Sequence, residues 1–355
     1  MNRLFRHMAI MVLAGATLLA GCAYDDTVRD MREHRSGSDS LAIEFNNGFI
    51  DNPVITRAVT LLSDHSNTMG VWGWQTTPDG AVERLFLNQE VTFNRLQGKW
   101  NYSPVKYWES HSNYRFCAYA PHDGGVDGTA TIDPTTLAIS IKGVTLNGCN
   151  TIDTAVVEAP ANFSTVQDVD WMIDRSVQNI AGTYRNEVAF NMQHILSKLC
   201  VRVERSSTFA SDTVIRVVID SIKIDDFISQ GNFAANTTGT PLDISEWTLV
   251  DTLPRYSMRS TPELSIPDSA VYVIESLLLP HHTRTDQTIR VWYSIGNEGG
   301  YINHFRSTFR LSEIFSTFLP GRNYQITFTV GPDVVTFDSG VSGWENQNMS
   351  STINK

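Results

Sequence analysis

Apolar and polar residues alternate along much of the chain, and a period of two is typical of β-strands with one buried face. This alternation predicts strands over residues 137–141, 199–203, 289–295 and 324–330. Two denser apolar runs, Val214–Ile224 and Ala270–Leu279, are rich in β-branched residues and predict core strands of a sandwich. The pattern therefore indicates an all-β fold.

Helical periodicity is weak by comparison. Only Phe163–Ile180 and Leu311–Phe318 are expected to hold a short helix each. A turn at 181–183, followed by a new strand pattern, predicts a domain boundary near residue 180. We therefore expect one β-sandwich domain over residues 41–180 and a second over residues 181–355.

The N-terminus has the three parts of a secretory signal: a cationic start, an apolar stretch over Met8–Leu19 and a small-residue cleavage site. The stretch ends in Leu-Ala-Gly-Cys, which resembles the lipobox of bacterial lipoproteins. This resemblance implies a signal peptide over residues 1–21 and a lipid on the sulfur of Cys22. Residues 22–40 are charged and rich in serine and glycine, and we expect them to form a tether.

Composition narrows the class of partner. The 355 residues are 41% hydrophobic, which is enough for a substantial core, and 27 Lys and Arg stand against 38 Asp and Glu. This acidic balance argues against a nucleic-acid partner. After the N-terminal stretch no further apolar segment is long enough to span a bilayer, which excludes an integral membrane channel or transporter.

Three cysteines remain once Cys22 is assigned to lipidation: Cys117, Cys149 and Cys200. An exported protein can form one disulfide from three cysteines and keep one free thiol. Three separately buried thiols are the other interpretation, and the spacing does not decide between them. The spacing matches no zinc motif.

Motifs of catalysis are absent from the sequence: it has no GxGxxG, GxxxxGK[ST], HExxH or GxSxG. His281 and His282 are adjacent, and neighbours on a strand point to opposite faces, so we interpret them as a polar turn and not as a metal pair. Acid pairs such as Asp225 and Asp226 do not by themselves indicate a glycosidase, although counting carboxylates does not exclude one. No enzymatic activity, cofactor or metal is predicted.

Tryptophans are concentrated in the N-terminal half, and four of them are candidates for binding a sugar or a protein: Trp72, Trp74, Trp100 and Trp108. The alternative is that they pack in the core and corners of the sandwich. Both interpretations stay open at this point.

Two of these tryptophans belong to a longer pattern. The segment Trp100–Trp108 reads W-x-Y-x-P-x-x-Y-W, and Phe116–Pro121 reads F-x-A-Y-x-P. Leu-Leu-Leu-Pro at 277–280, Pro-Gly-x-x-Tyr at 320–324 and a late Trp344 follow in order. Together these features resemble the fimbrillin family of Bacteroidetes surface lipoproteins. An acidic pair behind Cys22 is similar to the surface-export signal of such lipoproteins.

The resemblance implies two transthyretin-like β-sandwich domains and a role in type V fimbriae at the outer membrane. It also implies that an Arg-specific protease removes an N-terminal segment and that a strand of the next subunit fills the groove left behind. Arg57, followed by Ala58, matches the expected cleavage context. A cut there would release residues 22–57, which include the alternating sequence Ala-Ile-Glu-Phe at 42–45.

The C-terminal tail bears on the position of such a subunit in a fibre. A donor strand needs alternating apolar residues, yet Glu345–Lys355 offers only Met349 and Ile353. A donor built from Val334–Phe337 would require release of the last strand. The tail therefore favours a tip, anchor or accessory subunit, and the alternative is a non-polymerising surface lipoprotein that binds glycan or host protein.

Overall fold

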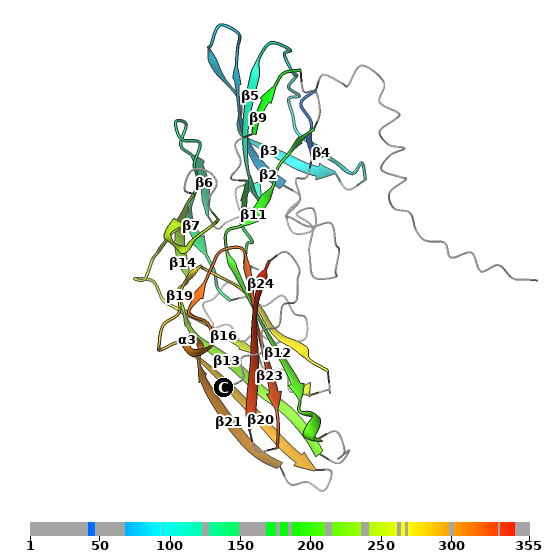
Figure 1. Ribbon diagram of the computed structural model, residues 1–355, viewed down its shortest axis with the longest axis vertical. Helices are drawn as coiled ribbons and strands as arrows, with labels where there is room; N and C mark the ends of the chain where they lie inside the picture. Colours follow the sequence, from blue (N-terminus) through cyan, green and yellow to red (C-terminus); the bar gives the residue numbers. More distant parts are fainter. Residues whose placement is uncertain are drawn as a thin grey trace, which may run out of the picture. The chain divides into compact units, whose positions relative to one another are not determined.

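In the residues that it describes, the computed structural model is built almost entirely of β-strands (Figure 1). It describes residues 42–46, 68–94, 96–122, 128–148, 168–174, 178–183, 187–209, 215–235, 241–260, 264–266, 269–297, 302–332 and 334–344. The chain divides into two units after Ala42, and the description below concerns the second unit, from Ile43 onward. The predicted all-β class is confirmed.

The first sheet has seven strands, and its neighbouring strands pair antiparallel. They are β2 (Thr68–Thr76), β3 (Val82–Asn94), β4 (Lys99–Asn101), β5 (Asn113–Ala120), β8 (Met172–Asp174), β9 (Gln178–Ala181) and β11 (Met192–His194). Their order is β11-β8-β5-β2-β3-β4, and β9 pairs with β5 beside β8.

The central strand β2 is buried along nearly its whole length, because hydrophobic clusters cover both of its faces. Trp72 and Trp74 belong to one cluster, and Met69 and Val71 belong to the other. A Cβ atom on Gly73 would lie 2.7 Å from Phe86 Cδ2 and 2.9 Å from Phe116 Cδ1. Glycine therefore lets aromatic rings pack directly against the backbone of β2.

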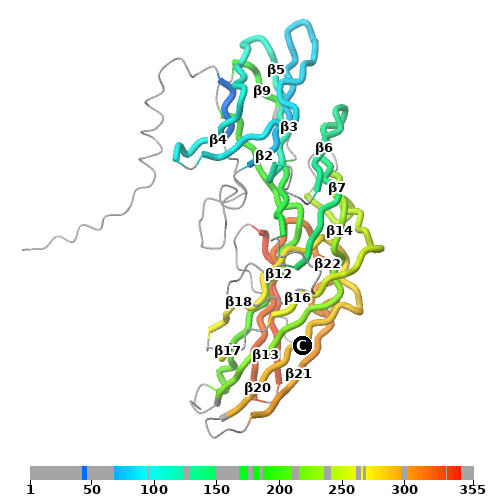
Figure 2. Tube along the Cα trace, turned by 180° about the vertical axis from the view of Figure 1, so that it is seen from behind, coloured from blue at the N-terminus to red at the C-terminus, as the bar shows by residue number. Residues whose placement is uncertain are grey.

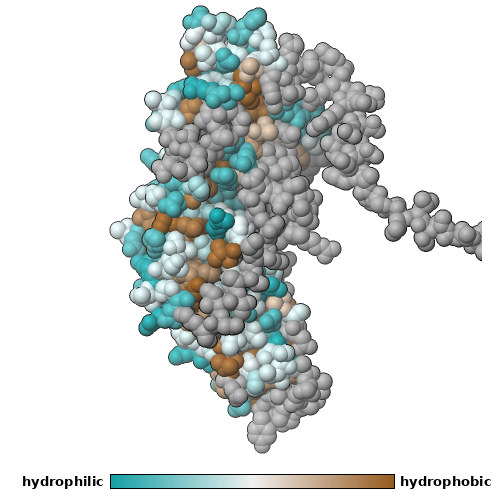
Figure 3. Space-filling view, in the orientation of Figure 1, coloured by the Kyte–Doolittle hydropathy of each residue, from teal (hydrophilic) through white to brown (hydrophobic). Residues whose placement is uncertain are grey.

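A second region is built from two further sheets. The first contains β12 (Ser197–Arg205), β18 (Val271–Leu278), β23 (Arg322–Val330) and β24 (Val335–Gly343) in the order β18-β12-β23-β24. The second contains β13 (Ile215–Phe227), β16 (Tyr256–Ser260), β17 (Leu264–Ser265), β20 (Thr288–Asn297) and β21 (Ile302–Arg310) in the order β16-β13-β20-β21, with β17 beside β13. Only β12 and β23 pair parallel among these strands. On the face drawn in Figure 3, apolar residues form separate patches between hydrophilic ones.

A four-stranded sheet joins parts of the chain from both sides of residue 180. It contains β6 (Thr129–Ile132), β7 (Ile139–Thr145), β14 (Gln230–Ala234) and β15 (Trp247–Leu249) in the order β15-β14-β7-β6. Two short pairs complete the set: β1 (Phe45–Asn46) with β10 (Val188–Ala189), and β19 (His281–His282) with β22 (Thr317–Phe318). The division into two domains near residue 180 stays a prediction.

The alternating runs lie in strands as predicted, in β12, β20 and β23. In β23 every second residue from Tyr324 to Val330 is buried. The run from residue 137 begins two residues too early, because Leu137 has a φ of 60° and its amide donates to the carbonyl of Asp133 in a turn. The dense runs correspond to β13 and β18.

The helix expected over 163–180 is wrong for the residues that are described there. Residues 172–174 form β8 and residues 178–181 form β9. Ile173 pairs with Tyr119 of β5 and is fully buried, so sheet pairing overrides the weak helical pattern. The helix expected near 311 is confirmed as the single turn α3 (Leu311–Ile314). Among the described residues, no helix has the length and apolar character to cross a membrane.

Candidate functional site

The residues predicted for lipidation and for proteolytic processing lie outside the described part of the chain. Cys22, Arg57 and Ala58 all lie in segments that are not described. The alternating segment upstream of Arg57 is described from residue 42 to residue 46, and it is the candidate site developed below.

The four candidate tryptophans are buried. Trp72, Trp74, Trp100 and Trp108 are 3%, 5%, 6% and 5% exposed, respectively. Trp72 stacks on Tyr119 at 4.9 Å between ring centroids. This burial argues against an exposed ligand platform and favours core packing. Hydrophobic clusters cover both faces of β2, the strand that carries Trp72 and Trp74.

Ile43 and Phe45 belong to the same hydrophobic core as Trp100 and Trp108. Ile43 is 1% exposed and Phe45 is 4% exposed. Four aromatic rings surround the ring of Phe45, and we call these four rings the aromatic seat. Their centroids lie 5.4 Å (Phe86), 5.4 Å (Tyr102), 6.0 Å (Phe116) and 5.6 Å (Phe190) from that of Phe45.

Main-chain hydrogen bonds hold the same segment from two sides. On one side, the amide of Ile43 donates to the carbonyl of Lys106 at 2.8 Å. On the other side, the amide of Val188 donates to the carbonyl of Glu44 at 2.7 Å, and β1 pairs parallel with β10. The segment therefore fills a strand position between the loop around Lys106 and β10.

A buried hydroxyl adds a third anchor to this segment. The hydroxyl of Tyr102 donates to the carbonyl of Ile43 at 2.7 Å. Burial raises the pKa of Tyr102 to about 12, so the hydroxyl keeps its proton at physiological pH. Lys99 Nζ lies 3.8 Å from Glu44 Oε1, but this partly exposed pair contributes little to stability.

The packing of this segment determines what its removal would expose. Burial of an isoleucine and a phenylalanine side chain is worth about 1.5–3 kcal/mol each, so the segment is well held in the intact chain. Its departure would expose the aromatic seat and leave the amide of Val188 and the carbonyl of Lys106 without their strand partner. Such an edge is a template for another strand.

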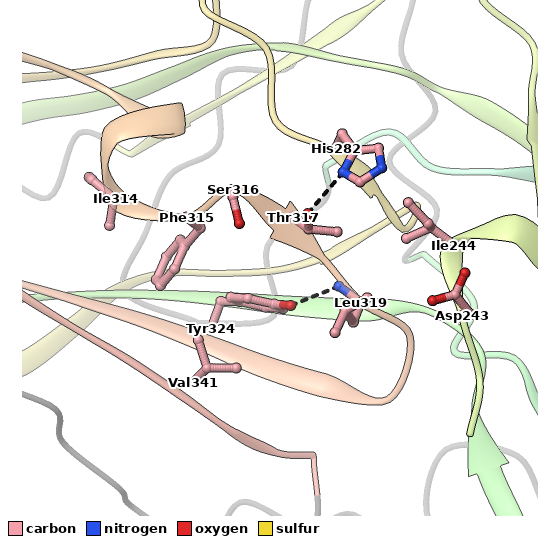
Figure 4. Close-up of a pocket in the computed structure, with 10 residues that line it drawn as sticks. All are labelled: Asp243, Ile244, His282, Ile314, Phe315, Ser316, Thr317, Leu319, Tyr324 and Val341. Atoms are coloured by element: carbon pink, nitrogen blue, oxygen red, sulfur yellow. Dashed lines mark hydrogen bonds between the residues drawn. The ribbon is translucent and has the colours of Figure 1, made fainter. Parts of the chain in front are cut away.

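The adjacent histidines do not form a metal pair. His281 is 7% exposed, and its ring nitrogens lie 2.7 Å from the carbonyl oxygen of Leu279 and 3.0 Å from Gln287 Nε2. Burial lowers the pKa of His281. His282 is exposed, and its Nδ1 lies 2.9 Å from Thr317 Oγ1 (Figure 4). The opposite directions predicted for the two rings are confirmed, but a short strand replaces the predicted turn.

His282 also lines the pocket drawn in Figure 4, which has a volume of about 630 Å³. On its wall the amide of Leu319 donates to the hydroxyl of Tyr324 at 2.7 Å. Asp243 and His282 are its titratable lining residues apart from Tyr324. Within the described part of the chain, no group of three or more His, Cys, Asp or Glu side chains could hold a metal ion.

Cations hold the acid pair of β13. Asp225 lies 2.7 Å from Lys223 Nζ and 2.5 Å from an Arg290 nitrogen. Asp226 lies 2.6 Å from Arg255 Nη1 and also contacts Arg284. These contacts give both carboxylates a structural role in ion pairs.

Two of the three remaining cysteines are free and buried, Cys117 and Cys200. Burial raises the pKa of each thiol to about 12, so both stay protonated and weakly reactive. Cys117 and Cys200 thus fit the interpretation of separately buried thiols, and Cys149 lies outside the described residues.

Sequence reasoning found the segment but missed how it is held. Nothing in the pattern places β10 beside it or assigns the hydroxyl of Tyr102 to the carbonyl of Ile43. The signal was the alternation of Ile43 and Phe45, which indicates that both side chains share one face.

Two solved structures and one family model are similar to this chain. A fimbrial protein from Bacteroides vulgatus has a similar structure with a TM-score of 0.56 at 14% identity, over 86% of this chain and 99% of that one. A protein assigned to cell adhesion from Bacteroides uniformis has a TM-score of 0.44 at 18% identity, over 86% and 98%. No curated protein matches the sequence. A family model described as fimbrillin-like matches residues 56–344, and the chain therefore belongs to the fimbrillin-like family.

Proposed function

We propose that the chain is a cell-surface fimbrial or adhesin subunit whose segment 43–46 is released by proteolysis and replaced by a strand of another subunit. Family membership supports the fimbrial or adhesive role. One observation supports the proposed strand exchange: Ile43 and Phe45 are buried in the core, yet they precede Arg57 in the sequence. A cut after Arg57 would leave them attached to that core by non-covalent contacts alone.

The proposed exchange follows the physics of strand addition. The amide of Val188 and the carbonyl of Lys106 would bond to the main chain of an incoming strand. The aromatic seat would take the apolar side chains at its alternate positions, as it takes Ile43 and Phe45 now. Main-chain bonds would give affinity, and the seat would fix register.

Membrane anchoring belongs to the same proposal. A lipid on Cys22 would hold the precursor at the outer membrane, and the tether over residues 22–40 would present it at the cell surface. The cut after Arg57 would then free the body from its anchor. We expect no catalytic activity and no cofactor.

The last strand among the described residues, β24, supports a tip or accessory position over a stalk position. Val335 is 5% exposed and lies in β24, which pairs with β23 along its full length. A donor built from Val334–Phe337 would have to break this pairing. We propose that this subunit accepts a strand and donates none.

Limited digestion tests the proposal. The chain without residues 1–22 is treated with a limiting amount of an Arg-specific protease, and an Arg57→Gln variant is the matched control. N-terminal sequencing is expected to find a new terminus at Ala58 in the parent chain and none in the variant. An unheated SDS gel is expected to show no ladder, whereas a ladder of high-mass species would contradict the acceptor-only role. Resistance at Arg57 would overturn the protease-triggered exchange and favour a non-polymerising surface lipoprotein.

A further inference from the structure

The last strand of the described chain, β24, is held unevenly along its length. Among the described strands it pairs only with β23, so it lies at the edge of its sheet. Near its start Val335 is 5% exposed, and the ring of Phe337 lies 5.3 Å from that of Phe309 and 6.3 Å from that of Phe328. A buried valine and two ring contacts therefore fix the first half of the strand.

The second half of β24 offers little for a core to pack against. Residues 339–343 read Ser-Gly-Val-Ser-Gly, and glycine in a strand has no side chain to pack and costs more entropy to order. Val341 is directly opposite Tyr324, which is 2% exposed, so both side chains lie on the inner face of the sheet. Val341 is nevertheless 43% exposed, and it lines the pocket drawn in Figure 4. This half of the strand therefore passes over a hollow.

A stacked pair of rings holds the end of this weak half, and we call the pair the clasp. The indole ring of Trp344 lies parallel to the imidazole ring of His194, with 4.0 Å between the ring centroids and 4° between the ring planes. His194 is 7% exposed, and its Nδ1 lies 2.8 Å from Oδ2 of Asp170, which helps to fix the plane of the imidazole. The amide of Trp344 also donates to the carbonyl of Gly321 at 3.0 Å.

The clasp joins two sheets of the fold. Trp344 follows β24, whereas His194 ends β11 of the seven-stranded sheet. In Figure 2 the red end of β24 lies near the green segment that leads from β11 into β12. The amide of Gly321, just before β23, donates to the carbonyl of Leu196 in the same segment at 2.8 Å. The clasp therefore attaches the end of an edge strand to the connection between β11 and β12.

We propose that residues 339–344 form a strap that opens when Trp344 leaves His194, while residues 335–338 stay in place. Segments with few buried apolar contacts open separately from the rest of a fold. Opening frees the edge of β23 from Arg322 to Ile326, and an unpaired edge is a template for another strand. The closed clasp is thus an autoinhibitory contact against strand addition at β23. The strap concerns the uncut chain, so the inference does not depend on processing at Arg57.

Amide hydrogen exchange of the uncut chain tests the strap, because the exchange rate of a protected amide reports how often its segment opens. Trp344→Ala is expected to speed exchange over residues 339–343 about tenfold, since a stacked ring pair and its burial shift an equilibrium by about that factor. The amides over residues 335–338 should keep the parent rate. Val341→Ala is the matched control, and it should change exchange less than about threefold because the side chain of Val341 is already 43% exposed.

A double-mutant cycle tests whether His194 is the partner that holds Trp344. His194→Ala should speed exchange over residues 339–343 as much as Trp344→Ala does, and the double variant should be no faster than either single variant, because all three lose the same contact. If Trp344→Ala does not fold, Trp344→Leu takes its place in the same comparison. Equal acceleration over residues 335–338 and 339–343 would overturn the strap, because β24 would then open as one unit. Unchanged exchange over residues 339–343 in both single variants would overturn the clasp.

Discussion

The two hydrophobic regions of this protein are closed in different ways. The sheets β18-β12-β23-β24 and β16-β13-β20-β21 are built entirely from residues 197–343. The aromatic seat is closed by residues 43–46, which lie upstream of the region 56–344 matched by the family model. The two sheets from residues 197–343 therefore lie within the family region, whereas the core around the aromatic seat includes a strand from outside that region.

The lengths of two parallel strand pairs, β12 with β23 and β1 with β10, show the same contrast. β12 and β23 are joined by eight registered residue pairs, from Lys198↔Asn323 to Arg205↔Val330. β1 and β10 are joined by two, Phe45↔Val188 and Asn46↔Ala189. A short strand held chiefly by two apolar side chains is suited to replacement, whereas a long central pairing is suited to permanence.

The largest expected effect on stability comes from the removal of one phenylalanine ring from each core. Phe45→Ala and Phe328→Ala each remove a fully packed ring and should each cost about 3–5 kcal/mol in the uncut chain. Urea unfolding before and after the cut at Arg57 distinguishes the two substitutions. The loss of unfolding free energy caused by Phe45→Ala should vanish once the segment is released, whereas the loss caused by Phe328→Ala should persist. A loss below about 1 kcal/mol for Phe45→Ala in the uncut chain would show that the seat is not well packed.

A methyl group added at Gly73 tests how closely the rings of the aromatic seat pack against β2. Gly73→Ala would press on the rings of Phe86 and Phe116 and should cost about 1–3 kcal/mol. Gly98→Ala is the matched control, because nothing lies within 4 Å of the added methyl and only its φ of +61° is unfavourable. Equal thermal midpoints for the Gly73 variant and the parent would contradict this close packing.

A smaller effect is expected from the hydroxyl that anchors the segment. Tyr102→Phe removes the bond to the carbonyl of Ile43 and should cost about 1 kcal/mol. After the cut the same change should speed release of the segment, which size-exclusion chromatography can time. Release at the parent rate would mean that this bond does not hold the segment.

The smallest expected effect is on the pH dependence of stability, and it concerns His281, which lies outside the aromatic seat. Burial lowers the pKa of His281, so the unfolded chain takes up its proton first as the pH falls. The contribution of His281 to stability should be complete above its unfolded pKa of about 6.5 and decline as the pH falls below that value. Thermal melts at pH 8 and pH 5 should therefore differ less in His281→Gln than in the parent. The exposed His282→Gln serves as the control, and an unchanged pH difference in His281→Gln would contradict this account.

Period-two alternation was enough to predict β12, β20 and β23. Tyr324–Val330 and Ile289–Ile295 have one face in the core and one outside, which is the arrangement that alternation reports. The pattern failed where both faces are covered. β2 has no polar face, so its tryptophans looked like candidates for a surface site although both are buried.

The site could be predicted only in part for a related reason. Alternation marked Ile43 and Phe45 as a strand, but a strand's partner depends on residues far away in the sequence. The partner β10 lies more than 140 residues downstream, and the ring of Tyr102 reaches the segment from a loop. The position of Lys223 opposite Arg259 and Arg290 likewise depends on strand register, because the three residues are far apart in the sequence.

Amide hydrogen exchange at Val188 tests the central claim most directly. This amide donates to the carbonyl of Glu44 and should be protected in the uncut chain. After a cut at Arg57 and removal of the released segment, its exchange should accelerate strongly, while the amides of β23 stay protected. Protection should return when a donor strand from another subunit fills the seat. Unchanged protection of Val188 after removal of the segment would contradict the account.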